Sequence, residues 1–154
     1  MSTYSITGNI VKKVEIYLEP MVIAMLKTYA KQKNEAGGIL LGHRYIDNLN
    51  IKFEIMRFTT PYSGDICTAN SYHRKDKRHS MEVSKFHSDT NGYGDFIGEW
   101  HTHPNGSSTA PSYQDFKAFS FAQKLSALPL VHIISNSHQI AIYNSRGKHV
   151  VTYL

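Results

Sequence analysis

The pattern of apolar and polar residues at the start of the chain predicts a strand followed by a helix. Apolar and polar residues alternate over residues 9–18, as they do in a half-buried strand. A helix is expected from Glu19 and Pro20 to about Gln32, because proline is tolerated in a first helical turn. Five apolar residues recur there at helical spacing and are expected to face the core: Met21, Val22, Met25, Leu26 and Tyr29.

The middle of the chain predicts a strand pair, a loop and a second helix. Residues 37–45 and 51–60 indicate consecutive strands, and residues 47–50 between them favour a turn. Residues 61–71 have the composition of a loop. Residues 72–90 are polar but compatible with a helix, whose inward-facing residues are expected to be Met81, Val83 and Phe86.

The last third of the chain predicts a strand that carries two histidines, then a helix and three further strands. Glycines at 92 and 94 mark the turn before the histidine strand. A helix is expected from near Ser112, and residues 128–135 and 139–143 predict a hairpin, with residues 149–154 as a last strand. The apolar face of the helix is expected to hold Phe116, Phe119, Ala122 and Leu125. Strands and helices in this order imply an α/β fold with helices packed on a mixed sheet.

Composition limits the class of protein. The 154 residues, taken as one domain over 1–154, are 41% hydrophobic, which excludes a disordered chain. The apolar runs are shorter than the ~20 residues that span a bilayer, and residues 1–13 lack the apolar core of a signal peptide. No membrane partner is expected, and the cytoplasm is the expected location. The single cysteine, Cys67, excludes an internal disulfide and is expected to be a small, partly buried side chain.

The net charge of +5 favours acidic partners. The excess is concentrated in residues 73–79, HRKDKRH. A solvated face is the first interpretation of this segment, and a docking surface for an acidic protein is the second. Nucleic acid is the least favoured partner, because no nucleic-acid-binding motif accompanies the charge.

Two histidines separated by one residue are the first sign of chemistry. His101 and His103 share one face of the predicted strand, ~6.6 Å apart. Asp115 follows twelve residues after His103. Two histidines and a carboxylate leave one position of a tetrahedral zinc ion for water, as in a catalytic site. Regular alternation places Ile97 and Glu99 on the histidine face, and Phe96, Trp100 and Thr102 on the other.

Ser112 and Asp115 also have an explanation that needs no metal. A serine at the start of a helix, with an acidic residue three positions later, is close to a capping box. The two roles are compatible, because a capped helix end is a rigid platform from which Asp115 can reach an ion.

A catalytic zinc site also needs a base for the bound water, and two glutamates compete for this role. Glu99 lies on the same strand face as His101. Glu35 precedes a pair of glycines, where backbone or substrate can approach closely. The spacing alone does not choose between them.

Three motifs together resemble the JAMM/MPN metalloprotease family: EAGGILLG from Glu35, HTHP from His101, and PSxxD up to Asp115. The resemblance implies a fold similar to that of cytidine deaminases, with a curved mixed β-sheet and helices packed around it. It implies one zinc ion per chain, with His101, His103 and Asp115 as ligands. Glu35 would be the general base and Ser112 the hydroxyl that stabilises the oxyanion. The eight residues between His103 and Ser112 exceed the usual seven, which makes the placement of Ser112 less secure than that of Asp115.

The resemblance implies a zinc-dependent isopeptidase or peptidase. Its expected substrate is the amide bond after the C-terminus of a ubiquitin-like or conjugated protein. The stretches SYHRKDKRHS and YGDFIGEWHTHP resemble short bacterial members that sit beside ubiquitin-activating-like and conjugating-like enzymes in antiphage operons. These enzymes are therefore expected partners.

A catalytically silent scaffold of the same fold is the alternative function. A zinc nucleobase deaminase is excluded, because such enzymes need a P-C-x-x-C motif and the chain has one cysteine. The other histidines, including His43, His87 and His132, are expected to be structural or exposed.

Overall fold

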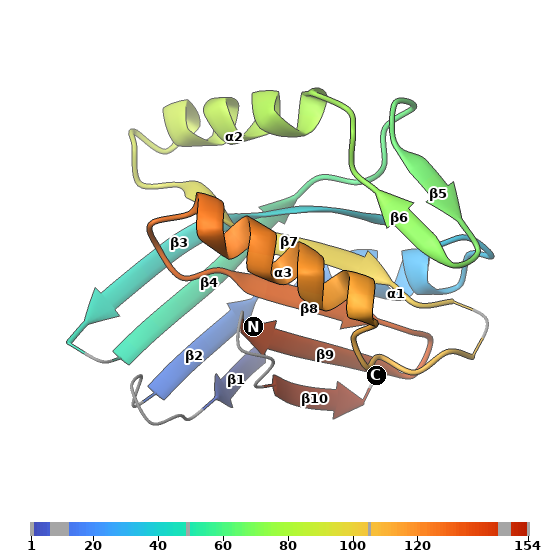
Figure 1. Cartoon of the computed structure of the whole chain (residues 1–154). Coiled ribbons are helices and arrows are strands. Elements are labelled where there is room, and N and C mark those ends of the chain that lie inside the picture. Colours follow the sequence, from blue (N-terminus) through green and yellow to red (C-terminus); the bar gives the residue numbers. More distant parts are fainter. Residues whose placement is uncertain (1, 7–12, 49, 105, 145–148, 154) are drawn as a thin grey trace.

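The computed structural model describes residues 2–6, 13–48, 50–104, 106–144 and 149–153 (Figure 1). The first elements in chain order are β1 (Ser2–Ile6), β2 (Lys13–Leu18), α1 (Pro20–Ala30), β3 (Gly37–Asp47), β4 (Asn50–Phe58), β5 (Ile66–Thr68) and β6 (Ser71–His73). They are followed by α2 (Arg78–Asp89), β7 (Asp95–Thr102), α3 (Tyr113–Leu125), β8 (Val131–Ser135), β9 (Gln139–Asn144) and β10 (His149–Tyr153). None of the helices in this part of the chain combines the length and the apolar character needed to cross a bilayer.

Eight of the described strands form one mixed sheet, in the order β1-β2-β4-β3-β7-β8-β9-β10. The pairs β2–β4 and β7–β8 are parallel, and the other pairs are antiparallel. The sheet curls until its edge strands, β1 and β10, approach one another (Figure 1). The short strands β5 and β6 form a separate hairpin. The predicted curved mixed sheet is therefore confirmed.

The two faces of the sheet pack against different helices. On one face, the buried residues of α1 join the main apolar core. The other face carries α2 and α3 (Figure 1). Strand β3 shows the division, because Leu40 belongs to the α1 core whereas Ile39 and Leu41 cluster with Phe86 of α2. In the same way, Phe119 of α3 packs against β8 and β9.

Strands β7 and β8 are parallel neighbours, and α3 is part of the connection between them. In such a crossover the helix runs back across the sheet, so its first turn starts near the carboxyl end of the preceding strand. His101 lies at that strand end, and Asp115 lies in that first helical turn. The topology therefore explains how the two residues meet.

Strand β7 departs from regular alternation at Ile97. The pairing register between β3 and β7 shifts at this point, which is the mark of a β-bulge. As a result Ile97 lies in the α1 core together with Trp100, whereas Phe96 packs on the α2 side. Regular alternation predicts Ile97 with His101 and Phe96 with Trp100, and both predictions are wrong.

The remaining differences from the predicted elements have local causes. Positions 9–12 of the first predicted strand, and residue 154 of the last, lie outside the described residues. Strands β1, β5 and β6 were not predicted, and in β5 and β6 three residues each are too few to show a period. Helix α2 begins at Arg78 rather than at residue 72. The helices contact the sheet along narrow stripes, so four side chains expected to face inward are exposed: Met21, Met81, Phe116 and Leu125.

Candidate metal centre

Three potential metal ligands from two elements meet at one point. His101 lies at the end of β7, His103 directly follows the strand, and Asp115 lies in the first turn of α3. The Nε2 atoms of His101 and His103 are 3.1 Å apart. Asp115 Oδ1 lies 3.2 Å from His101 Nε2, and Asp115 Oδ2 lies 3.2 Å from His103 Nε2. Ligand atoms at ~2.0–2.1 Å from a tetrahedral zinc ion are separated by ~3.3 Å. These contact distances are close to the separation of ligand atoms around zinc, so the three side chains are near enough to share one ion.

The hydrogen bonding of His103 favours a cation at this point. Its Nδ1 lies 2.7 Å from the carbonyl oxygen of Ser108, and because a carbonyl only accepts, Nδ1 carries the proton. In the neutral form of this ring, the lone pair of Nε2 points toward the carboxylate of Asp115. A lone pair facing a carboxylate is unfavourable unless a proton or a metal ion lies between them. The donor set of two imidazoles and one carboxylate fits zinc with one open position.

Asp115 serves the helix as well as the cluster. Its Oδ2 accepts a 2.7 Å hydrogen bond from the backbone N–H of Ser112, and Ser112 Oγ accepts one from the N–H of Asp115 at 3.1 Å. This capping box confirms the predicted cap at Ser112. Burial opposes the ionisation of Asp115, but the contacts with His101 and His103 hold its pKa well below the ordinary value. The carboxylate is thus charged and oriented by the same contacts.

Glu35 lies beside this cluster because two distant segments are hydrogen-bonded together. The next residue, Ala36, donates its N–H to Thr102 Oγ1 at 2.9 Å and accepts the N–H of Thr102 at 2.8 Å. In the same ladder, Gly37 lies opposite His101. Burial raises the pKa of Glu35, and the opposing charges of the two histidines do not cancel this effect. A carboxylate with a raised pKa is a better proton acceptor near neutral pH.

Glu99, the competing base, is engaged in a different contact. Its carboxylate forms an ion pair with Arg74, from the segment that follows β6. The guanidinium of Arg74 thus already occupies this carboxylate. The geometry therefore favours Glu35 over Glu99, a choice that the spacing alone leaves open.

The loop between His103 and Ser112 is fastened to the sheet. Thr109 is buried, its carbonyl oxygen accepts a 2.8 Å hydrogen bond from the hydroxyl of Tyr143, and its own hydroxyl donates to Gln139. The additional residue in this loop therefore does not prevent Ser112 from capping α3.

The other residues singled out from the sequence have structural surroundings. His43 and His87 each place Nδ1 within 3.0 Å of a backbone carbonyl oxygen. His132 is buried and stacked on Phe119, with ring centroids 4.1 Å apart. The structural roles expected for these three histidines agree with these contacts. Cys67 is partly buried, as expected.

Three residues that shape the centre were not identified from the sequence. Thr102 lies between the two histidines in the sequence, and its side chain is buried. A hydroxyl at a strand position that is predicted to be buried indicates a hydrogen bond. Ser108 contributes a backbone carbonyl, which no side chain reveals. Arg74 belongs to the basic segment 73–79, and the sequence of this segment does not indicate which acidic residue pairs with each basic side chain.

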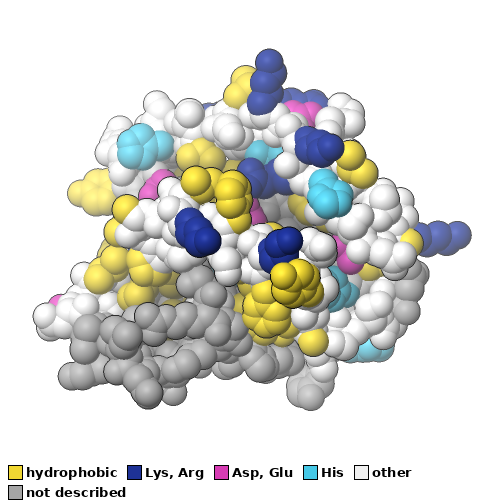
Figure 2. Space-filling model, in the orientation of Figure 1, with side chains coloured by type: hydrophobic (Ala, Val, Ile, Leu, Met, Phe, Trp, Pro, Cys, Tyr) yellow, Lys and Arg dark blue, Asp and Glu magenta, His cyan; other side chains and the backbone are white. Residues whose placement is uncertain are grey.

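Lys and Arg side chains are scattered over the face that carries α2 and α3, with uncharged and apolar side chains between them (Figure 2). They do not gather on this face into the single stripe that is typical of nucleic-acid-binding surfaces.

A family model described as prokaryotic homologs of the JAB domain matches residues 20–146 of the chain. The chain belongs to this family. The JAB match runs from α1 to the end of β9, so it includes Glu35, both histidines and the start of α3. The family expected from the three sequence motifs is confirmed.

Two curated relatives of the JAB-family chain have names that describe an activity. A CD-NTase/cGAS isopeptidase of Escherichia coli is 30% identical over 101 residues, which are 64% of this chain and 62% of the relative. The probable metalloprotease y4qB of Sinorhizobium fredii is 31% identical over 98 residues, which are 63% of this chain and 58% of the relative. The chain thus aligns with less than two thirds of either relative, and the names support a JAB-type peptidase function.

A solved structure supports the fold. The solution structure of protein DSY2949 from Desulfitobacterium hafniense aligns with a TM-score of 0.55 and 18% identity, over 90% of this chain and 89% of that one. At this identity the likeness shows the fold alone. It agrees with the expected JAB-like α/β fold.

Proposed function

We propose that this JAB-family protein is a zinc-dependent peptidase or isopeptidase, with one zinc ion per chain held by His101, His103 and Asp115. The observation that carries the proposal is the cluster of His101, His103 and Asp115, whose facing atoms are 3.1–3.2 Å apart, beside the partly buried Glu35. The similarity to an isopeptidase and to a probable metalloprotease supports the same class of reaction. A catalytically silent scaffold, the alternative, has no need of this complete set of side chains.

The reaction needs an activated water, a base and a donor to the oxyanion. A bound zinc ion would lower the pKa of its water to ~7. The carboxylate of Glu35 would accept the proton of the attacking water and return it to the leaving amine nitrogen. The hydroxyl of Ser112 keeps its proton for the oxygen on which negative charge develops, because in the helix cap it acts as an acceptor. One water is consumed for each amide bond, and the products are a carboxylate and an amine.

The proposed substrate is the amide bond that follows the extended C-terminal tail of a ubiquitin-like or conjugated protein. Strand β7 is paired on both sides, with β3 and β8, so the main sheet has no free edge at the histidines. The β5–β6 hairpin lies closer to the chemistry, since the carbonyl of Thr68 accepts the N–H of Glu35 at 2.7 Å. A tail added as a strand to this hairpin would satisfy its own backbone groups and present one amide to the centre.

The partners and the biological setting belong to the same proposal. We propose ubiquitin-activating-like and conjugating-like enzymes as partners, in the cytoplasm of a bacterium that uses them against phage. The name of the Escherichia coli relative, CD-NTase/cGAS isopeptidase, supports a conjugate of a CD-NTase-type enzyme as the first substrate to test.

The test uses the purified protein and a ubiquitin-like protein joined through its C-terminus to a CD-NTase-type enzyme. We expect cleavage that a chelator abolishes and that added zinc restores. Glu35→Gln should keep the zinc and lower kcat by about 10²- to 10⁴-fold, because it removes the proton acceptor. Mass spectrometry of the products locates the cut and distinguishes an isopeptide from a linear peptide bond.

Two outcomes would overturn the proposal. Undiminished cleavage by E35Q in the presence of chelator would refute the zinc mechanism. A protein that neither contains zinc nor cleaves the conjugate after zinc is added would favour the scaffold.

A further inference from the structure

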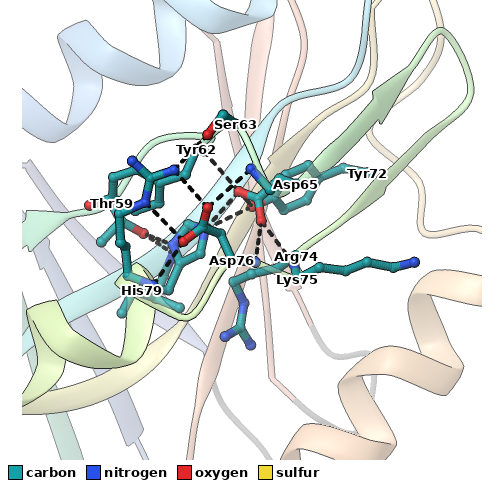
Figure 3. A network of polar contacts seen from close by, with 12 residues as sticks. Thr59, Tyr62, Ser63, Asp65, Tyr72, Arg74, Lys75, Asp76 and His79 are labelled. Atoms are coloured by element: carbon teal, nitrogen blue, oxygen red, sulfur yellow. Dashed lines mark hydrogen bonds and ion pairs between the residues drawn. The ribbon is translucent and has the colours of Figure 1, made fainter.

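Most residues of the basic segment 73–79 are exposed, but side-chain contacts also tie the segment to the fold. Arg74 is ion-paired with Glu99, and Arg78 with the aspartate two residues before it. His79 is completely buried. In Figure 3 the side chain of Lys75 points away from these contacts, toward the outside of the cluster. The segment therefore calls for a structural explanation before a docking role.

One buried carboxylate organises the segment. The side chain of Asp65 has 0% exposure and accepts five hydrogen bonds of 2.7–3.1 Å (Figure 3). The donors are the backbone N–H groups of Tyr62, Lys75 and Asp76, the hydroxyl of Tyr72, and His79 Nε2. Burial disfavours the charge on Asp65, but these bonds hold its pKa well below the ordinary value. The carboxylate thus joins the loop after β4, the end of β6 and the start of α2.

His79 connects this carboxylate to β3. A carboxylate only accepts, so Nε2 of His79 carries the proton, and Nδ1 accepts from the hydroxyl of Thr59 at 2.5 Å. Thr59 Oγ1 in turn accepts the N–H of Ile39 at 3.0 Å. Every polar atom along this path has a partner of the right kind. The path runs from Asp65 through His79 and Thr59 to the first half of β3.

The same network reaches the candidate metal centre at two points. The ring of Tyr72, whose hydroxyl donates to Asp65, lies so close to Gly37 that a Cβ there would be 2.3 Å from it. In the partner strand of the hairpin, the carbonyl of Thr68 accepts the N–H of Glu35 at 2.7 Å. The hairpin that the network fixes is therefore the hairpin that holds Glu35.

We propose that Asp65 and His79 are positioning residues, which hold the β5–β6 hairpin, and through it Glu35, against the metal-ligand cluster. The inference rests on the proposed function, because Glu35 is the residue that is positioned. The three proposed ligands come from the end of β7 and from α3, outside the network. Loss of the contact between Asp65 and His79 should therefore lower turnover without releasing zinc.

The kinetic test compares Asp65→Asn and His79→Leu with two matched variants. His79→Gln keeps an N–H that can donate to Asp65, and Val22→Ala lowers stability in the α1 core, on the other face of the sheet. We expect kcat of D65N and H79L to fall about ten- to a hundredfold, with KM within about threefold of wild type and zinc retained. H79Q should lie between H79L and wild type. V22A should keep the wild-type kcat.

Hydrogen exchange gives a second readout that needs no activity. The N–H of Glu35 donates to Thr68, so its exchange reports directly on the contact between the hairpin and the base. It should become about tenfold faster in D65N and H79L, while the amides of β7 exchange as in wild type. If the wild type cleaves no conjugate, the proposed function fails. Hydrogen exchange of the Glu35 amide then still shows whether Asp65 and His79 hold Glu35 in place.

The inference is overturned by any of three results with an active wild type. The first is an unchanged kcat in D65N and H79L. The second is unchanged exchange of the Glu35 amide in these variants. The third is a loss of kcat that V22A shares, because the effect is then one of stability alone.

Discussion

Thr102 holds Ala36 with hydrogen bonds from both its backbone and its side chain, and this contact joins the two halves of the candidate centre. The hydroxyl of Thr102 accepts the N–H of Ala36 at 2.9 Å, and the N–H of Thr102 donates to the carbonyl of Ala36 at 2.8 Å. Both residues are buried, although they are 66 positions apart. Since Thr102 lies between His101 and His103, the strand end that presents the histidines also sets the position of Glu35.

We predict that Thr102→Val retains zinc but loses stability and turnover. Valine has nearly the same shape, but it leaves the N–H of Ala36 buried without a partner, at a cost of about 1–3 kcal/mol. Denaturant unfolding measures the free energy of unfolding, and metal analysis measures the zinc. Thr102→Ser keeps the hydroxyl and is the control. Equal losses in T102S and T102V would show that the methyl group, and not the hydrogen bond, is what matters.

Ser112 has two roles that two substitutions can separate. Ser112→Ala removes the helix cap and should lower the free energy of unfolding by about 1 kcal/mol, whereas Ser112→Gly should cost only a few tenths of a kcal/mol. Both variants lack the hydroxyl that is proposed to donate to the oxyanion, so both should lose about 10²- to 10³-fold in kcat. Unfolding curves and steady-state kinetics are measured on the same zinc-loaded samples. A kcat that follows stability, with S112G near wild type, would refute the catalytic role.

The two glutamates near the histidines should respond differently to neutralisation. Glu99→Gln removes the ion pair with Arg74, and the loss of a partly exposed pair should change kcat by less than about tenfold. Glu35→Gln should lose far more, as argued above. Steady-state kinetics on one conjugate, at equal zinc content, makes the comparison. If E99Q is as damaging as E35Q, the role of base passes to Glu99.

The parts of the fold that are predictable from the sequence are those with a clear period or a clear chemistry. Residues 37–45 and 51–60 predict consecutive strands, which the structure contains as β3 and β4. The capping pattern predicts the start of α3, because Ser112 and Asp115 satisfy each other without help from the rest of the chain. The His-x-His motif at the end of β7 brings two donors together by local geometry alone.

The rest depends on tertiary contacts that no local pattern contains. The bulge at Ile97 is set by the pairing of β3 with β7, so strict alternation misplaces Ile97 and Phe96. Asp65 and His79 are buried only because they meet each other and the backbone of the 62–76 loop. In a single sequence, a histidine within a basic run gives no indication that its side chain is buried. The resemblance to a known family supplied the choice of Glu35 over Glu99, which the contacts of Arg74 then support.

His132 offers a test of how burial affects stability against pH. Neither of its ring nitrogens has a hydrogen-bond partner among the described residues. Burial, together with the nearby His101, lowers the pKa of His132 from 6.5 to about 3. Between these values the unfolded chain binds one more proton than the folded one. Stability is therefore complete above pH 6.5 and decreases as the pH falls toward 3, by at most about 1.4 kcal/mol per pH unit.

We predict that His132→Leu removes this part of the acid sensitivity. At pH 7 its free energy of unfolding should equal or exceed that of wild type, because leucine leaves no buried nitrogen without a partner. The measurement is urea unfolding of the chelator-treated protein from about pH 7 to pH 4, so that metal release does not enter the comparison. Ile133→Val, on the opposite face of β8, is the control and should lower stability by about 0.5–1.5 kcal/mol without changing the slope. Parallel curves for wild type and H132L would show that His132 takes up its proton in the folded protein as easily as in the unfolded chain.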